Sequence, residues 1–135
     1  MNRTPLSSLA LGIALTILAA PSIARADPCE GALPRQGASF SGLVRYVGDG
    51  DSLCVGPAGR PERWIEIRLA DFNATELNAR GGRDAKRLLA DVAMGRSLVC
   101  RAGRRSYDRV VAACTLDGRP LGDVLRARGA REGGR

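Results

Sequence analysis

The sequence contains no histidine, and this absence excludes several kinds of active site. Hydrolases that use an imidazole as base or nucleophile cannot be built from this chain. Zinc sites that need histidine ligands are excluded as well, and no Cys-x-x-Cys spacing occurs. Any hydrolytic chemistry must therefore rest on carboxylates, arginines, tyrosines and a bound cation.

Long apolar runs are also lacking, apart from one near the N-terminus. Arg3 precedes the run LALGIALTILAA, and the motif ARA before Asp27 has the small-x-small pattern of a cleavage site. The run is shorter than the roughly 20 residues of a membrane span, and Pro21 ends it. We expect residues 1–26 to be a signal peptide, with an uncleaved anchor as the alternative. The mature protein would be periplasmic or secreted, with no stable membrane insertion.

Lysine is almost absent, because Lys86 is the only one, yet the chain is strongly basic. It has 21 Lys and Arg residues against 14 Asp and Glu, a net charge of +7 that becomes +5 without residues 1–26. A basic surface suits a polyanion, and the planar arginine fork is a good phosphate ligand. Nucleic acid is therefore a candidate partner, although the arginine bias could also reflect a GC-rich genome.

Four cysteines in a small exported domain indicate disulfides, because the export route is oxidising. Three pairings are possible. We favour Cys100–Cys114, because these residues flank an expected hairpin, which leaves Cys29–Cys54. The second bond would tie an N-terminal lead, residues 27–39, to the domain.

The hydrophobic pattern predicts an α+β fold. Period-two runs separated by turns indicate strands, and the stripe in RDAKRLLADVAMG has helical spacing. The order is three strands, a helix, two strands and a helix, which favours an OB-fold, a five-stranded small β-barrel capped by two helices. We expect strands at 40–47, 52–56, 64–72, 97–100 and 110–116, a loop at 101–109, and helices at 83–95 and 121–129.

The stretch VGDGDSLCV places Asp49 and Asp51 on either side of a glycine between two expected strands. One interpretation is a simple turn, because Asp-Gly is common at strand ends. The other is a site for a hard cation, because paired acidic oxygens at short spacing are what Ca²⁺ or Mg²⁺ needs.

Four blocks in order resemble the thermonuclease family, whose best-known member is staphylococcal nuclease. They are VGDGDSLCV, IRLADFNATE, SYDRVVAACTLDGRPL and GDVLRARGAR. Together they span residues 40–130, and the five remaining residues would be a short basic tail. The resemblance implies an OB-type barrel and a calcium-dependent nuclease that cleaves DNA and RNA with little sequence preference. It favours a single-stranded substrate, and we expect a monomer.

The resemblance also implies a role for individual residues. Asp51 matches a direct metal ligand, with Asp49 in a supporting position. Glu76 matches the carboxylate that positions or deprotonates the attacking water. Arg68 and Arg109 match the two arginines that bind the transferring phosphate.

Further positions are candidates for binding the metal or the nucleotide. Ala74 falls where the family uses a backbone carbonyl as metal ligand, and Tyr107 matches a tyrosine that packs against the nucleotide. Arg104 and Arg105 are candidate phosphate contacts that would add salt-sensitive affinity, with a solvated turn as the alternative.

The sequence departs from the family pattern at two of these positions. Asn73 stands where the family has its second metal-binding aspartate, and an amide coordinates calcium without adding charge. Asp71 could share a face with Asn73 if the strand stays extended. Asp108 replaces a glycine before Arg109 and could restrain that side chain or repel phosphate.

These departures keep three hypotheses open. The first is an active exported nuclease that uses Ca²⁺. The second is a module that binds nucleic acid but has lost its cutting ability, because Asn73 lacks the charge of aspartate. The third is a structural or inhibitory envelope protein that reuses the fold, since fold does not determine function.

Overall fold

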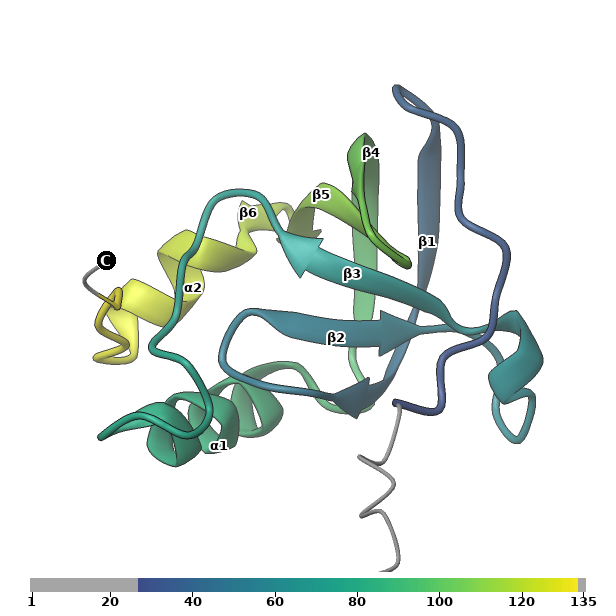
Figure 1. Cartoon of the computed structure of the whole chain (residues 1–135). Helices are drawn as coiled ribbons and strands as arrows, with labels where there is room; N and C mark the ends of the chain where they lie inside the picture. The colour runs from purple at the N-terminus through teal and green to yellow at the C-terminus, as the bar shows by residue number, and fades with distance from the viewer. Residues whose placement is uncertain (1–26, 134–135) are drawn as a thin grey trace, which may run out of the picture.

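The computed structural model describes residues 27–133. The expected signal peptide, residues 1–26, and the last two residues of the expected tail lie outside the described part. Six strands, two α-helices and one short 3₁₀ helix form the domain (Figure 1). In chain order they are β1 (Ser39–Val47), β2 (Ser52–Val55), η1 (Pro61–Arg63), β3 (Ile65–Leu69), α1 (Gly82–Ala93), β4 (Ser97–Ser106), β5 (Arg109–Leu116), β6 (Arg119–Pro120) and α2 (Leu121–Ala127).

The strands form one sheet that curls into a barrel-like ring. Their order is β3-β2-β1-β4-β5-β6, and all neighbours in that order are antiparallel. An additional parallel pairing of β3 with β5, which sets Ile67 opposite Val110, joins the two sides of the sheet. The molecule is thus a small, mainly antiparallel sheet with two helices, the α+β class that the hydrophobic pattern predicted.

The chain between residues 101 and 109 differs from the prediction of a loop. β4 continues to Ser106, and the ladder with β5 shifts register between Ala102 and Arg105. Such a bulge breaks the period-two pattern, which is why alternation did not reveal the strand. The consequence is that Arg104 and Arg105 stand on a strand beside β5.

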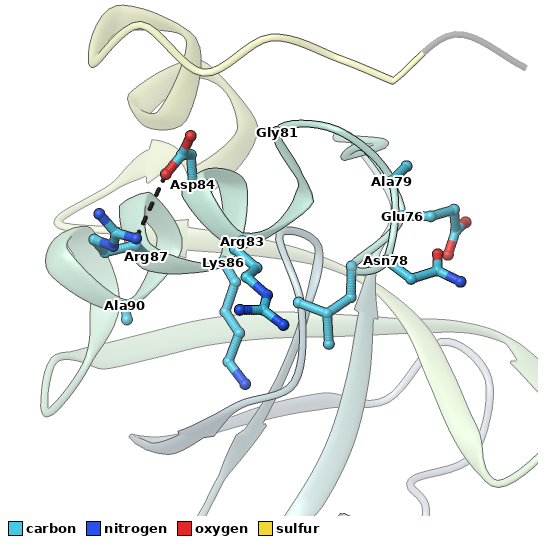
Figure 2. Close-up of a pocket in the computed structure, with 10 residues that line it drawn as sticks. Glu76, Asn78, Ala79, Gly81, Arg83, Asp84, Lys86, Arg87 and Ala90 are labelled. Atoms are coloured by element: carbon cyan, nitrogen blue, oxygen red, sulfur yellow. Dashed lines mark ion pairs between the residues drawn. The ribbon is translucent and has the colours of Figure 1, made fainter.

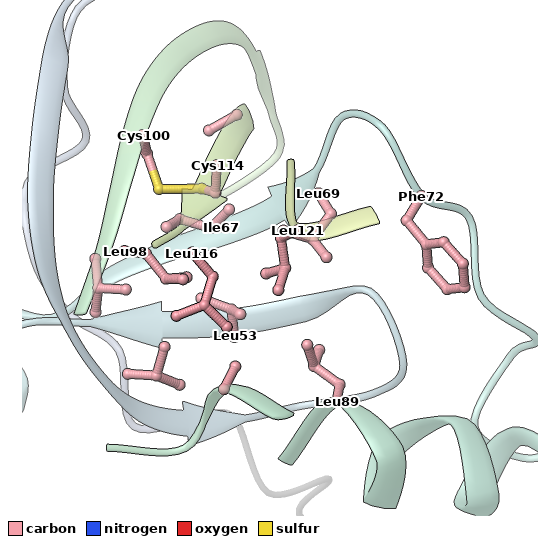
Figure 3. Packing of buried hydrophobic residues seen from close by; sticks show 14 of the residues in the cluster. Leu53, Ile67, Leu69, Phe72, Leu89, Leu98, Cys100, Cys114, Leu116 and Leu121 are labelled. Atoms are coloured by element: carbon pink, nitrogen blue, oxygen red, sulfur yellow. A yellow bond between two sulfur atoms is a disulfide. The ribbon is translucent and has the colours of Figure 1, made fainter. Parts of the chain in front are cut away.

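The core fills the inside of the ring and the space under the helices. Ile67 and Leu69 of β3 are buried together with Leu89 of α1, as their periodicity predicted. Figure 3 shows these side chains with Leu53 from β2 and Leu121 from α2 in one cluster. Both helices are therefore held by apolar burial against the sheet.

Two disulfides fasten the domain, with the pairing expected from the sequence. Cys100–Cys114 joins opposite residues of the β4–β5 ladder, and Cys29–Cys54 ties the N-terminal lead to β2. Within residues 27–133, neither α-helix has the length and apolar character that crossing a membrane would require.

Candidate functional site

The turn between β1 and β2 uses its two aspartates differently. The Asp49 carboxylate accepts hydrogen bonds from the Asp51 amide at 3.0 Å and from the Ser52 hydroxyl at 2.7 Å, as in an Asx-turn. Gly50 is required here, because a Cβ atom would lie 2.5 Å from the Cβ of Ala74. Asp49 therefore shapes the turn, and the turn places Asp51 in the interior.

Asp51 is a buried carboxylate, with 6% of its surface exposed. Its Oδ2 accepts the backbone N–H of Ala74 at 2.6 Å, and its Oδ1 lies 3.3 Å from Nε of Arg68. Burial raises the pKa of Asp51 to about 6, and the charge of Asp49 adds to the rise, while the Ala74 N–H and Arg68 oppose it.

Asp49 behaves in the opposite way. Burial alone would raise the pKa of Asp49, but hydrogen bonds from the Asp51 amide and the Ser52 hydroxyl, with the charge of Arg109, hold it below its usual value. The turn therefore carries Asp49, which ionises readily, beside Asp51, which is harder to ionise.

Arg68 fastens the chain that follows β3. Its guanidinium donates to the carbonyl oxygens of Leu69 and Phe72, the latter at 2.8 Å, and to Oδ1 of Asn73 at 2.6 Å. With Asp51 at its Nε, the side chain is only partly exposed. Arg68 is thus oriented by four groups of its own chain.

Asn73 also meets the C-terminal segment. Its Nδ2 donates to the carbonyl oxygen of Gly133, and its backbone N–H donates to Glu132, both at 3.3 Å. Ala74 forms an isolated antiparallel bridge with Glu132. The start of the expected basic tail therefore docks on the same loop that holds Asn73 and Ala74.

A hollow of about 360 Å³ opens between β3, β5 and this loop. Three arginines from separate strands line it, together with an amide and two carboxylates. The charged and amide residues of the lining are Arg68, Asp71, Asn73, Arg104, Arg109 and Glu132. Within residues 27–133, Arg109 has no side-chain hydrogen bond or ion pair that would compete for a ligand.

Asp71 lies at the edge of this hollow but serves α2. Its Oδ2 accepts the Gly122 N–H at 3.0 Å, whereas its buried Oδ1 has no hydrogen-bond partner among the described residues. Asp71 and Asn73 both line the hollow, with one Asp71 oxygen bound to the start of α2, and a shared role at a metal stays a prediction.

Glu76 and Tyr107 do not line the arginine hollow. Glu76 is exposed and borders a second hollow beside α1, where Arg83 and Lys86 extend from the helix and Asn78 lies on the preceding loop (Figure 2). Tyr107 is 92% exposed at the β4–β5 turn and has a positive φ of 56°. Arg105 is exposed on β4.

Glu66 is not among the candidate residues, because the alternation in WIEIRLADF predicts that its side chain faces solvent. Only 9% of this residue is exposed. Burial raises the pKa of Glu66 to about 7, helped by the charges of Asp27 and Asp108 and opposed by that of Arg109. Strand alternation could not reveal this burial, because the covering residues come from distant parts of the chain.

Comparison with known proteins does not identify the chain: no protein-family model matches it, and no curated protein is similar to it. The chemistry must be argued from the geometry. Three arginines can bind an oxyanion such as a phosphodiester, and Asp51 and Asn73 offer oxygens to a hard cation.

Proposed function

We propose that the chain is an exported, metal-dependent nuclease of the thermonuclease type, which hydrolyses DNA or RNA with little sequence preference. The observation that carries this proposal is the arginine hollow, where Arg68, Arg104 and Arg109 surround a space beside the buried Asp51. Strand-derived arginines that converge on one space are suited to a phosphate, and contacts to phosphate carry no sequence information.

The arginines would have different tasks. Arg68 is held by its own chain and would present a fixed positive charge to the phosphate. Arg109, which has no ion pair among the described residues, is available for bidentate binding to the phosphoryl oxygens as charge develops on them. Arg104 would add affinity for the neighbouring phosphate.

A hard cation bound beside the hollow would have modest affinity, because the Asp51 and Asn73 oxygens already accept hydrogen bonds from the Ala74 N–H and from Arg68. Asp51 and the Asn73 amide would hold it, with Asp49 supporting the turn, and the Ala74 carbonyl remains a candidate. The fit rests on oxygen donors around a buried carboxylate whose ionisation a cation would favour. When bound, Ca²⁺ would polarise the phosphate and favour ionisation of water.

Glu76 would orient or deprotonate the attacking water. It stands three residues after Asn73 on the same loop, and its exposed carboxylate is free to meet a substrate that lies over the site. Tyr107 is exposed and could stack on a base, while Arg105 would add a salt-sensitive contact.

The wider expectations follow from the same proposal. We propose that the barrel-like ring is an OB-fold, because its five main strands close through β3 and β5 and a helix lies between β3 and β4. Two disulfides fit an oxidising compartment, hence a periplasmic or secreted protein. We propose that it acts as a monomer.

The proposal is tested by digestion of single-stranded DNA and RNA with the purified, oxidised protein, in calcium and in chelator. We expect fragments only with calcium. Arg109→Ala and Glu76→Ala should each reduce the rate by about 100-fold or more, since each removes transition-state stabilisation or base catalysis. The control is Arg119→Ala, an exposed arginine of β6. Equal rates for all four proteins would contradict the mechanism.

The second candidate function is nucleic-acid binding without cleavage. It is favoured by Asn73, whose amide contributes no charge and already accepts a hydrogen bond from Arg68. Under this alternative, the wild type binds single strands in a salt-sensitive way but leaves them intact, and Asn73→Asp gains calcium-dependent cleavage. Failure to bind nucleic acid even at low salt would instead favour a structural role.

A further inference from the structure

We propose that Asp27, Glu66 and Asp108 form a binding site for a hard divalent cation, separate from Asp51 and independent of the proposed nuclease activity. In residues 27–133 this is the one group of three carboxylates whose oxygens all lie within 4.8 Å of one another. It joins the start of the N-terminal lead, strand β3 and the β4–β5 turn.

The fold brings these three residues together through two independent constraints. Cys54 lies opposite Glu66 in the β2–β3 ladder, and its disulfide to Cys29 holds the lead beside that position. The Cys29 amide then donates to Oδ1 of Asp27 at 2.9 Å, which orients the carboxylate. Asp27 thus reaches Glu66 because a covalent bond positions the lead.

The third carboxylate arrives through the parallel pairing that joins the two sides of the sheet. Val110 of β5 lies opposite Ile67 of β3, so the turn before β5 stands next to Glu66. Asp108 occupies that turn, directly before Arg109. Asp108 therefore adds a third carboxylate at this cluster.

Glu66 is the observation that indicates a ligand. Only 9% of the residue is exposed, and within the described residues its carboxylate, whose oxygens keep a small exposed area, has no hydrogen bond and no ion pair. A largely buried carboxylate without a partner is costly, and two further carboxylates nearby make it more so. The positive charge of Arg109 partly offsets the negative charge of the three carboxylates, but none of its nitrogens forms an ion pair with them. A cation would satisfy all three groups at once.

The spacing fits calcium-like ligation. Oxygens bind Ca²⁺ at about 2.3–2.6 Å, so two ligands on opposite sides of the ion are separated by up to about 5 Å. The carboxylate oxygens of Asp27, Glu66 and Asp108 all lie within 4.8 Å of one another, which is compatible with that separation. The ion would fasten the lead to the sheet and offset the negative charge next to Arg109.

The test is a titration with Mn²⁺, a paramagnetic probe, followed by broadening of backbone amide NMR signals in the oxidised protein. We expect the amides near Asp27, Glu66 and Asp108 to broaden at low Mn²⁺, and Ca²⁺ to reverse the broadening. Glu66→Gln and Asp108→Asn should each weaken this binding by about tenfold or more, because each removes one of three charged ligands.

Two further variants separate this site from the nuclease proposal. Asp51→Asn should leave broadening at Glu66 unchanged, whether or not the protein cuts nucleic acid. Asp91→Asn, which removes an exposed carboxylate of α1, should change nothing. Absence of broadening at the cluster in millimolar Mn²⁺ would overturn the proposal. So would broadening there that persists unchanged in both Glu66→Gln and the exposed-turn variant Asp108→Asn.

Discussion

Ionisation of Glu66 places a charge in a buried position of β3. Its pKa is raised from 4.5 to about 7, so the folded state favours the protonated form. The resulting stability is present below about pH 4.5 and is lost as the pH rises through about 7. In chelator, we expect Glu66→Gln to be more stable than the wild type at pH 8 by roughly 2–3 kcal/mol, with little difference at pH 4.

Urea unfolding of both proteins at pH 4 and pH 8 checks this prediction. The Glu66→Gln variant should still lose some free energy of unfolding as the pH rises, because Asp51 is unchanged. The pKa of Asp51 is raised from 3.8 to about 6, so this loss occurs at lower pH than the loss from Glu66. An identical pH dependence in the two proteins would show that Glu66 ionises as easily in the folded state as in the unfolded one.

Arg68 and Arg109 differ in what holds them, and this difference gives a second prediction. Arg68→Ala removes an ion pair to buried Asp51 and three hydrogen bonds, so it should cost about 2 kcal/mol of folding free energy as well as activity. Arg109→Ala breaks no hydrogen bond or ion pair among the described residues and removes only a charge that offsets nearby carboxylates, so it should cost less than about 1 kcal/mol.

Thermal unfolding and digestion rates measured on the same samples separate the two effects. Arg109→Ala should lose activity with a nearly unchanged melting temperature, whereas Arg68→Ala should lose both. An Arg68→Ala protein as stable as the wild type would mean that the guanidinium does not hold the loop from Leu69 to Asn73.

At the scale of elements, β4 depends on a glycine at its bulge. A Cβ on Gly103 would lie 2.7 Å from the carbonyl oxygen of Val111, a backbone atom that cannot move aside as a flexible side chain can. We therefore expect Gly103→Ala to destabilise the protein by about 1–3 kcal/mol. Arg101→Ala, an exposed change on the same strand, is the control, and denaturant unfolding of both variants is the measurement.

Helices and strands with a clear hydrophobic period in their own residues were predicted from the sequence. Features that depend on contacts with distant segments of the chain were not. The period of Leu88, Leu89 and Val92 identified α1, and the alternation around Ile67 identified β3. The second half of β4 has no apolar alternation, because the register shifts between Ala102 and Arg105 and residues 103–106 are Gly, Arg, Arg and Ser. The same reasoning applies to Glu66, because its neighbours Asp27 and Asp108 come from distant parts of the chain.

In the candidate site, too, local features could be predicted from the sequence and contacts between distant segments could not. The Asx-turn at Asp49 is local and follows from VGDGDS, whereas the contacts of Asn73 with Arg68 and with Gly133 depend on chain segments that are far apart. Residue types indicated which groups carry chemistry. Their hydrogen-bond partners required the folded chain, because register and packing decide which segments meet.

At the scale of the whole molecule, the Cys29–Cys54 bond couples the lead to the proposed cation site. Replacing both cysteines with serine should cost roughly 3 kcal/mol by the loop-entropy estimate and should release Asp27 from the sheet. We therefore expect the double variant to lose the Mn²⁺-dependent broadening at Glu66 and Asp108 at low Mn²⁺, below the melting temperature of the variant.

The other disulfide supplies the matched control. Cys100–Cys114 lies within the β4–β5 ladder, so replacing both of its cysteines with serine should cost a comparable amount of stability without freeing the lead. Broadening at Glu66 should then persist in this control and vanish in the other variant. Equal loss in both would show that general destabilisation empties the site, whereas persistence in both would show that the cation binds without Asp27.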